Sequence, residues 1–414
     1  MRRLAGRIRP YAWGSRTGIA ALQGRPAPSA GPEAELWLGA HPDDPSLLLD
    51  PTAADLRPAA DPGPGADSTA PDSGRSLLAA VEADPEGMLG VGVVKRFGAR
   101  LPYLLKVLAA ERPLSLQAHP DLAQARAGYA AEEAAGVPRD AGHRNYSDPN
   151  HKPELLVAVS EFVALCGFRP AGEAAALLDR LRLPELGSTV DSLRAGELRT
   201  AVRGLYELDS GARTGLVERV AESCRGLAGA APEYAEAADL ADRYPGDLGV
   251  LVSLLLNRAV LRPGEAIYMP AGNPHAYLRG VGVEVMASSD NVLRGGLTPK
   301  YVDVPELLRV LRYTELPEPR LAPVPAGDGV VWWPAPVPDF RLARASLTGG
   351  RVTLPLPGGA SPRIVFCLTG TVRVDGPDGG LALGAGEAAF VPATEDEITA
   401  AGTGELYQAT TGEL

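Results

Sequence analysis

The chain has 414 residues, enough for two or three domains with buried cores, and 45% of its residues are hydrophobic. Its formal net charge of -11 argues against nucleic acid as a partner, and an anionic substrate would need a local cluster of basic side chains. The N-terminal stretch MRRLAGRIRPYAWGS has no apolar run behind its charges, so we expect no signal peptide, and no apolar stretch is long enough to span a membrane. Three cysteines without CxxC spacing predict reduced thiols in a cytoplasmic protein.

The first hundred residues predict short strands, a loop and a helix. Residues 1–46 contain strand-like pieces and turns, among them PYAWGS and AELWLGAHPDDPS. Residues 47–75 are rich in Pro, Ala, Asp and Gly, a composition that cannot form a core and predicts a flexible surface loop. A short helix is expected at SLLAAVEADP, and LPYLLKVLAA predicts a strand after it.

The stretch LSLQAHP that follows alternates between apolar and polar residues. Leu116 and Ala118 alternate with Ser115, Gln117 and His119, so a strand would place the three polar side chains on one face. That face could be exposed to solvent, or it could line a small barrel built around a metal. The pattern alone leaves both interpretations open.

A helical pattern covers Leu122 to about Ala135 and then occupies almost all of the chain between Gly172 and Asn257. Apolar residues recur there at spacings of three and four, with turn residues between the segments. We predict a small helical bundle that is inserted in the chain, because short β runs return after it.

Two of those later β runs resemble each other. GEAIYMPAGNPHAY begins at Gly264 and GEAAFVPATEDEIT begins at Gly386, and both share the order Gly-Glu-Ala, apolar residues, Pro-Ala and a loop. This predicts one structural unit used in each of two β-barrel domains. The first copy has His275 where the second has Glu397, so only the first copy could hold a metal.

Four residues in these segments form a candidate metal site. Gln117 and His119 share a strand face, Glu154 begins the strand ELLVAV, and His275 follows a strand in the loop GNPH. Two imidazole nitrogens, one carboxylate and one amide oxygen suit a divalent ion such as zinc and allow an open position for water or substrate. The lack of thiolate ligands argues against a closed structural zinc site.

Three long blocks of the sequence resemble the type I mannose-6-phosphate isomerase family: LPYLLKVLAAERPLSLQAHP, NYSDPNHKPELLVA, and the stretch from Gly264 to Leu307. The resemblance implies a mainly β fold with an inserted α-helical domain, in which a cupin (jelly-roll) barrel is repeated twice and the second copy lacks the metal. It implies a catalytic cupin domain at 1–171 and 258–314, a helical domain at 172–257 and a cupin-like β domain at 315–414.

The resemblance also implies roles for site residues. It assigns one zinc ion to Gln117, His119, Glu154 and His275, and it assigns catalysis to Arg294. Further pocket positions fall at Lys106, Ser115, Lys152 and Lys300. Only four of the 40 basic residues are lysines, and three of those four lie at these positions, which suggests that arginine would not serve there.

The implied reaction is a zinc-dependent interconversion of mannose 6-phosphate and fructose 6-phosphate through an enediolate. Arg294 could stabilise the oxyanion or bind the phosphate, for which Lys106, Lys300 and Ser115 are further candidates. The general base stays open among His151, Lys152, Asp290 and a zinc-bound water, and Asp290 could equally shape a turn.

Three alternatives remain beside this reading. One is an isomerase or epimerase of another phosphorylated sugar, and another is a non-catalytic sugar-phosphate sensor on a cupin scaffold. An iron-dependent cupin oxygenase is disfavoured by the amide ligand and the pocket lysines. We expect a cytoplasmic monomer, with at most weak self-association, that binds a small-molecule sugar phosphate and neither nucleic acid nor membrane.

Overall fold

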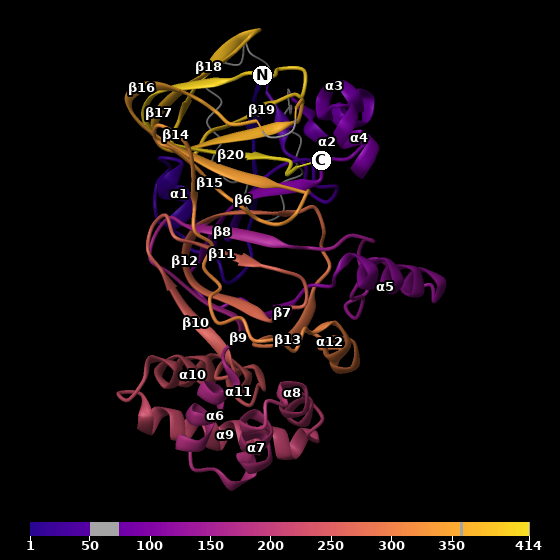
Figure 1. Cartoon of the computed structure of the whole chain (residues 1–414), viewed down its shortest axis with the longest axis vertical. Helices are drawn as coiled ribbons and strands as arrows, with labels where there is room; N and C mark the ends of the chain where they lie inside the picture. Colours follow the sequence, from indigo (N-terminus) through magenta and orange to yellow (C-terminus); the bar gives the residue numbers. More distant parts are fainter. Residues whose placement is uncertain (50–73, 357–358, 414) are drawn as a thin grey trace.

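The computed structural model describes residues 1–49, 74–356 and 359–413. Strands form two stacked bodies, and a group of helices lies at the end away from both chain termini (Figure 1). Most of the loop predicted at 47–75 lies outside the described residues, and its described ends form β4 (Leu47–Leu48) and β5 (Arg75–Ser76), which pair with each other. No helix in the described ranges is both long and apolar enough to cross a membrane.

The middle body is a barrel organised around one long strand, β12 (His275–Ala287). Its C-terminal half pairs with β6 and β8, and its N-terminal half pairs with β7 and β9. The partners change at Gly280, whose φ is 122° and where a Cβ atom would lie 2.6 Å from the Glu161 carbonyl oxygen. Only glycine fits there, and this allows one strand to serve both sides of the barrel. The other strands of this body are β2 (Arg7–Arg9), β3 (Glu35–Leu38), β6 (Tyr103–Ala110), β7 (Leu116–Ala118), β8 (Glu154–Ala158), β9 (Phe162–Phe168), β10 (Leu256–Leu261), β11 (Ala266–Met269) and β13 (Leu293–Gly296).

The predicted strand and helix segments are confirmed in this part of the chain. LPYLLKVLAA contains β6, and all eight of its residues are buried, as expected for an apolar strand covered on both faces. The helix predicted from Leu122 is α5 (Leu122–Ala134), which begins with a capping box between Asp121 and Gln124. In the described part of the N-terminal hundred residues, short helices accompany the two β bodies: α1 (Gly18–Leu22), α2 (Leu77–Ala83), α3 (Pro85–Leu89) and α4 (Val91–Phe97).

The helical pattern between Gly172 and Asn257 is also confirmed, up to the start of β10 at Leu256. The helices pack on the end of the middle barrel that lies away from both chain termini (Figure 1) and share one apolar core with it. That core includes Leu205 and Val252 of the helices and Leu116 and Leu293 of the strands. The elements are α6 (Ala171–Arg180), a 3-10 turn (Pro184–Leu186), α7 (Gly187–Arg194), α8 (Leu198–Tyr206), α9 (Ser210–Leu227), α10 (Pro232–Arg243) and α11 (Gly249–Ser253). A later helix, α12 (Val304–Val310), joins the same core.

The second β body contains the C-terminal strands and, unexpectedly, the N-terminal strand β1 (Arg2–Ala5). β1 pairs antiparallel with β19, so that Leu4 lies opposite Ala388. The sequence does not predict this pairing, because a strand of four residues carries no mark of a partner almost 400 positions away. The C-terminal strands are β14 (Val324–Gly327), β15 (Val330–Trp333), β16 (Arg341–Thr353), β17 (Arg363–Gly376), β18 (Gly379–Gly384), β19 (Ala388–Val391) and β20 (Thr399–Thr410).

The two β bodies are joined by a continuous apolar core. Val107 and Val285 of the middle barrel belong to the same buried cluster as Phe340 and Phe366 of the C-terminal body. The Tyr103 hydroxyl donates its one proton across this junction, where the carbonyl oxygens of Pro362 (3.0 Å) and Ala409 (3.1 Å) both lie within hydrogen-bond distance. The C-terminal body is therefore packed rigidly against the middle barrel, and its residues at this junction can hold side chains of the barrel in place.

Candidate active site

Three predicted ligands meet inside the middle barrel. His119 directly follows β7, Glu154 begins β8 and His275 begins β12, and all three are buried. The Nε2 atoms of His119 and His275 lie 3.2 and 3.3 Å from the two carboxylate oxygens of Glu154. The three ligand atoms lie within 4.8 Å of one another. Strands remote in the sequence thus bring together one carboxylate and two imidazoles.

Both imidazoles are oriented for metal binding. The Nδ1 atom of His119 lies 2.7 Å from the Asn291 carbonyl oxygen, and that of His275 lies 3.1 Å from the Asn273 carbonyl oxygen. Since a carbonyl only accepts, each Nδ1 donates and leaves the Nε2 lone pair directed at Glu154. Neither Nε2 atom has a hydrogen-bond partner among the described residues. A buried acceptor without a partner is unfavourable, and a cation bound between these groups removes that penalty.

The protonation states fit a metal as well. Burial lowers the pKa of His119 to about 4, so this imidazole is neutral at pH 7. Burial alone would raise the pKa of Glu154, but the interactions of its carboxylate with His119, which is protonated only in acid, and with the Lys152 ammonium hold that pKa well below its ordinary value. His119 and Glu154 are therefore deprotonated at neutral pH, and nitrogen and carboxylate donors of this kind suit zinc.

The fourth predicted ligand, Gln117, lies on β7 beside this group. Its cross-strand partners are His275 on β12 and Arg294 on β13. Directly opposed residues point to the same face of a sheet, so the amide, the imidazole and the guanidinium share one face. Gln117 therefore stands between the candidate metal centre and the predicted catalytic arginine.

Arg294 and Lys300 are neighbouring cations. No carboxylate among the described residues lies within ion-pair distance of either side chain. Burial lowers the pKa of Arg294, and burial together with the charge of Arg294 lowers the pKa of Lys300. Two neighbouring cations left unpaired in an acidic protein favour a site for an anion such as a phosphate group.

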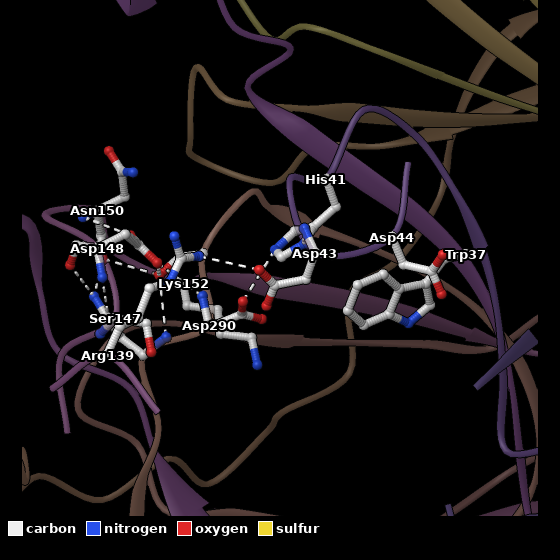
Figure 2. A network of polar contacts seen from close by, with 12 residues as sticks. Trp37, His41, Asp43, Asp44, Arg139, Ser147, Asp148, Asn150, Lys152 and Asp290 are labelled. Atoms are coloured by element: carbon white, nitrogen blue, oxygen red, sulfur yellow. Dashed lines mark hydrogen bonds and ion pairs between the residues drawn. The ribbon is translucent and has the colours of Figure 1, made fainter. Parts of the chain in front are cut away.

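Lys152 and Asp290, two of the candidate bases, lie at the edge of the same site. The Lys152 ammonium is buried and lies 3.3 Å from Glu154 Oε1. Asp290 Oδ2 lies 3.2 Å from His41 Nε2, and Figure 2 shows these residues with Lys152 beside them. Burial would raise the pKa of Asp290, but the bond to His41 and the charge of Lys152 lower it to about 2. Asp290 is therefore an anion at neutral pH.

Lys106 and Ser115 are placed differently from each other. The Lys106 ammonium is buried between Glu284 Oε2 at 3.4 Å and Glu35 Oε1 at 3.7 Å, so its charge is already balanced, which does not favour a phosphate contact. Despite Lys106, burial raises the pKa of Glu284 to about 7. Ser115 is half-buried immediately before β7.

We expect the substitution Lys106→Met to lower the free energy of unfolding by about 3–5 kcal/mol, because it leaves Glu35 and Glu284 buried without a cation. Denaturant unfolding followed by circular dichroism measures the change. The double variant Lys106→Met/Glu284→Gln removes one of the two carboxylates and should recover part of the loss. A double variant as unstable as the single one would contradict this account.

His151, the remaining candidate base, is held by the C-terminal body. Its Nε2 atom lies 2.9 Å from Oδ2 of Asp339, a buried residue two positions before β16. This contact links the segment that carries Lys152 to the second β body. This contact was not predicted, because no feature of the residues around Asp339 marks that aspartate as a partner of His151.

Several residues of the site were not predicted. Asn291 is fully buried and contacts both His119 and the segment before β8, and Tyr277 places its hydroxyl 3.5 Å from Glu154 Oε2. The pair of Lys106 and Glu284 could have been found, since each is a lone charge in an apolar strand, in LLKVL and in VEVM. Two such charges predict each other as partners in neighbouring strands.

Comparison with known proteins agrees with this architecture. Residues 1–171 match the family model described as phosphomannose isomerase type I, catalytic domain. The chain is 37% identical to mannose-6-phosphate isomerase of Escherichia coli over 412 residues, which covers 98% of each chain. The crystal structure of a single-residue variant of phosphomannose isomerase from Salmonella typhimurium matches all of both chains with a TM-score of 0.87 and 36% identity. A zinc-bound mannose 6-phosphate isomerase matches with a TM-score of 0.84 and 36% identity, covering 100% of this chain and 99% of that one.

Proposed function

Because the chain belongs to the type I phosphomannose isomerase family, we propose that it interconverts mannose 6-phosphate and fructose 6-phosphate at the site of His119, Glu154 and His275. The observation that carries this proposal is the buried trio itself, with both Nε2 atoms directed at one carboxylate. These three residues and Gln117 would hold the zinc ion, which would supply Lewis-acid polarisation of the sugar oxygens.

The side chains around the trio have separable tasks in this reaction. A proton moves between C1 and C2 of the open-chain sugar through an enediolate, so a base must reach both carbons. Arg294 and Lys300 bind the phosphate and hold the sugar, and the Arg294 guanidinium also faces the negative charge that develops on the sugar oxygens. Lys152, Asp290 and His151 are the proton-transfer candidates, and His151 is bound through Nε2 to Asp339.

A substrate panel on zinc-loaded protein tests this function. We expect mannose 6-phosphate to be converted to fructose 6-phosphate faster than other aldose phosphates, such as ribose 5-phosphate, are isomerised. Reaction in D₂O should place deuterium on the carbon that receives the proton, as an enediolate requires. Faster turnover of another sugar phosphate would favour the alternative isomerase, and binding without turnover would favour a sensor.

The phosphate assignment predicts a selective effect at Lys300. A hydrogen bond to a charged group contributes about 1.5–3 kcal/mol, so Lys300→Ala should raise KM for mannose 6-phosphate by about 10–100-fold. KM for unphosphorylated mannose should change little. Lys95→Ala, at an exposed lysine on α4, is the matched control. Equal effects on both sugars would remove Lys300 from the phosphate site.

We also propose that the C-terminal body repeats the catalytic barrel without its metal site, so that the domains fall at 1–171 with 258–314, 172–257 and 315–414. Strand registers support the repeat: Met269 of β11 lies opposite Glu154, and Val391 of β19, the matching residue of the second copy, lies opposite Arg363. The Arg363 guanidinium donates to the Asp396 carbonyl oxygen (3.1 Å) in the following loop. A fixed cation thus stands where the first copy has its carboxylate ligand. Metal analysis should find one zinc per chain, and two would contradict the repeat as proposed.

We propose further that the protein is a cytoplasmic monomer. All three cysteines are buried free thiols, which supports a reducing compartment. Sedimentation should give a mass near the 43.1 kDa of one chain, and a stable dimer would contradict this proposal.

A further inference from the structure

The segment 147–153, which leads into β8, carries Lys152. The side-chain amide of Asn291 holds the first part of this segment by hydrogen bonds. Oδ1 of Asn291 accepts from the backbone N–H groups of Ser147 (2.8 Å) and Asp148 (3.2 Å). Its Nδ2 donates to the carbonyl oxygens of Asp148 (2.7 Å) and Asn150 (2.8 Å). Figure 2 shows Asp148 and Asn150 on one side of Lys152. These bonds end at Asn150, so they do not fix the two residues that follow it.

The next fixed point comes from the C-terminal body. His151 donates through Nε2 to Asp339 Oδ2 at 2.9 Å, and Asp339 is only 4% exposed. Among the described residues this is the one ion pair or side-chain hydrogen bond of Asp339. A buried carboxylate is costly unless it is paired, so this contact determines where the His151 ring lies.

The position of His151 is transmitted to Lys152 by the local backbone. His151 and Lys152 lie between Pro149 and Pro153. Proline fixes its own φ and restricts the residue before it to extended conformations, so this short segment is stiff. A displaced His151 would therefore carry Lys152 away from its position 3.3 Å from Glu154 Oε1.

We propose that the C-terminal β body contributes a positioning residue to the active site, and that Asp339 acts by holding His151 and thereby placing Lys152. The inference rests on the proposed function, since its effect is measured on mannose 6-phosphate turnover. It gives the second β body an indirect part in the reaction, through the position of Lys152.

A double-mutant cycle on Asp339 and His151 tests the proposal. Misplacing a catalytic group by about 1 Å can cost as much as about 100-fold in rate, so we expect Asp339→Ala to lower kcat by about 10–100-fold. KM should stay within about twofold, because Arg294 and Lys300 are untouched. The double variant Asp339→Ala/His151→Ala should lose no more than either single variant, since all three break the same link.

Two further variants separate positioning from chemistry and from misfolding. His151→Gln keeps an N–H donor for Asp339 and should retain more activity than His151→Ala. Asp339→Asn keeps the shape of the side chain and tests the link if Asp339→Ala does not fold. Asp375→Ala removes an aspartate that pairs with Arg351 elsewhere on the C-terminal body and should leave kcat unchanged.

The possible outcomes are distinct. Wild-type kcat in a folded Asp339 variant, or losses that multiply in the double variant, would overturn the proposal. Equal inactivation by His151→Gln and His151→Ala, with Asp339→Ala still active, would also overturn it and make His151 a catalytic residue. Absence of mannose 6-phosphate turnover in the zinc-loaded wild type would instead reject the proposed function.

Discussion

Glu154→Gln should lose its zinc and at least about 1000-fold in kcat/KM for mannose 6-phosphate, as expected when a metal that orients the substrate and stabilises charge is removed. Glu154 is the one carboxylate of the trio, and it faces His119 Nε2, His275 Nε2 and Lys152 Nζ within 3.3 Å. Glutamine has almost the same shape but no charge. The variant therefore keeps the packing of the barrel and removes the anion that the cationic centre needs.

Metal analysis and a coupled assay on the same preparation measure both effects of Glu154→Gln. Chelation of the wild type should reproduce the loss of activity, and added zinc should restore it in the wild type only. Glu161→Gln, at an exposed glutamate next to the strand pair β8 and β9, is the matched control and should keep both zinc and activity. Full turnover by zinc-free protein would overturn the assignment of the centre.

Local patterns were sufficient to predict the elements that hold this centre. The alternation around Gln117 and His119, the apolar strand after Glu154 and the loop before His275 each describe a few neighbouring residues. On a strand, such a pattern also determines the face on which each side chain lies. Once the strands are adjacent, the side chains on a shared face come together and form the site. The choice between a solvent face and a barrel interior, open for LSLQAHP, needed the structure, which buries His119 and half-buries Gln117.

Contacts between distant segments were the part that the sequence could not supply. Lys106 resembled a substrate lysine because it is one of only four, yet two carboxylates from β3 and β12 balance its charge. His151 was one of several predicted bases, and the fold adds a bond from its ring to Asp339. In both cases the residue type was read correctly as unusual, but its role depends on a partner that only the fold brings near.

Arg294→Ala is the second variant for which we expect a large effect, a loss of about 100–1000-fold in kcat with zinc retained. The guanidinium has no counter-ion among the described residues and shares a sheet face with Gln117 and His275, so its charge is available to the reacting sugar. Removing the guanidinium does not disturb the contacts among His119, Glu154 and His275. Arg294→Ala should therefore keep its zinc, whereas a substitution of a metal ligand should lose it.

Conservative replacement and chemical rescue decide what Arg294 contributes. Arg294→Lys keeps the charge but loses the planar fork, so it should recover only part of the activity, and free guanidinium ion should raise the activity of Arg294→Ala. Arg279→Ala, at a half-exposed arginine of β12 that pairs with Glu236, is the control and should behave as wild type. If Arg294→Ala instead lost zinc in proportion to activity, the arginine would be acting on the metal centre and not on the sugar. Unchanged turnover would remove it from the reaction, and the phosphate would then depend on Lys300 alone.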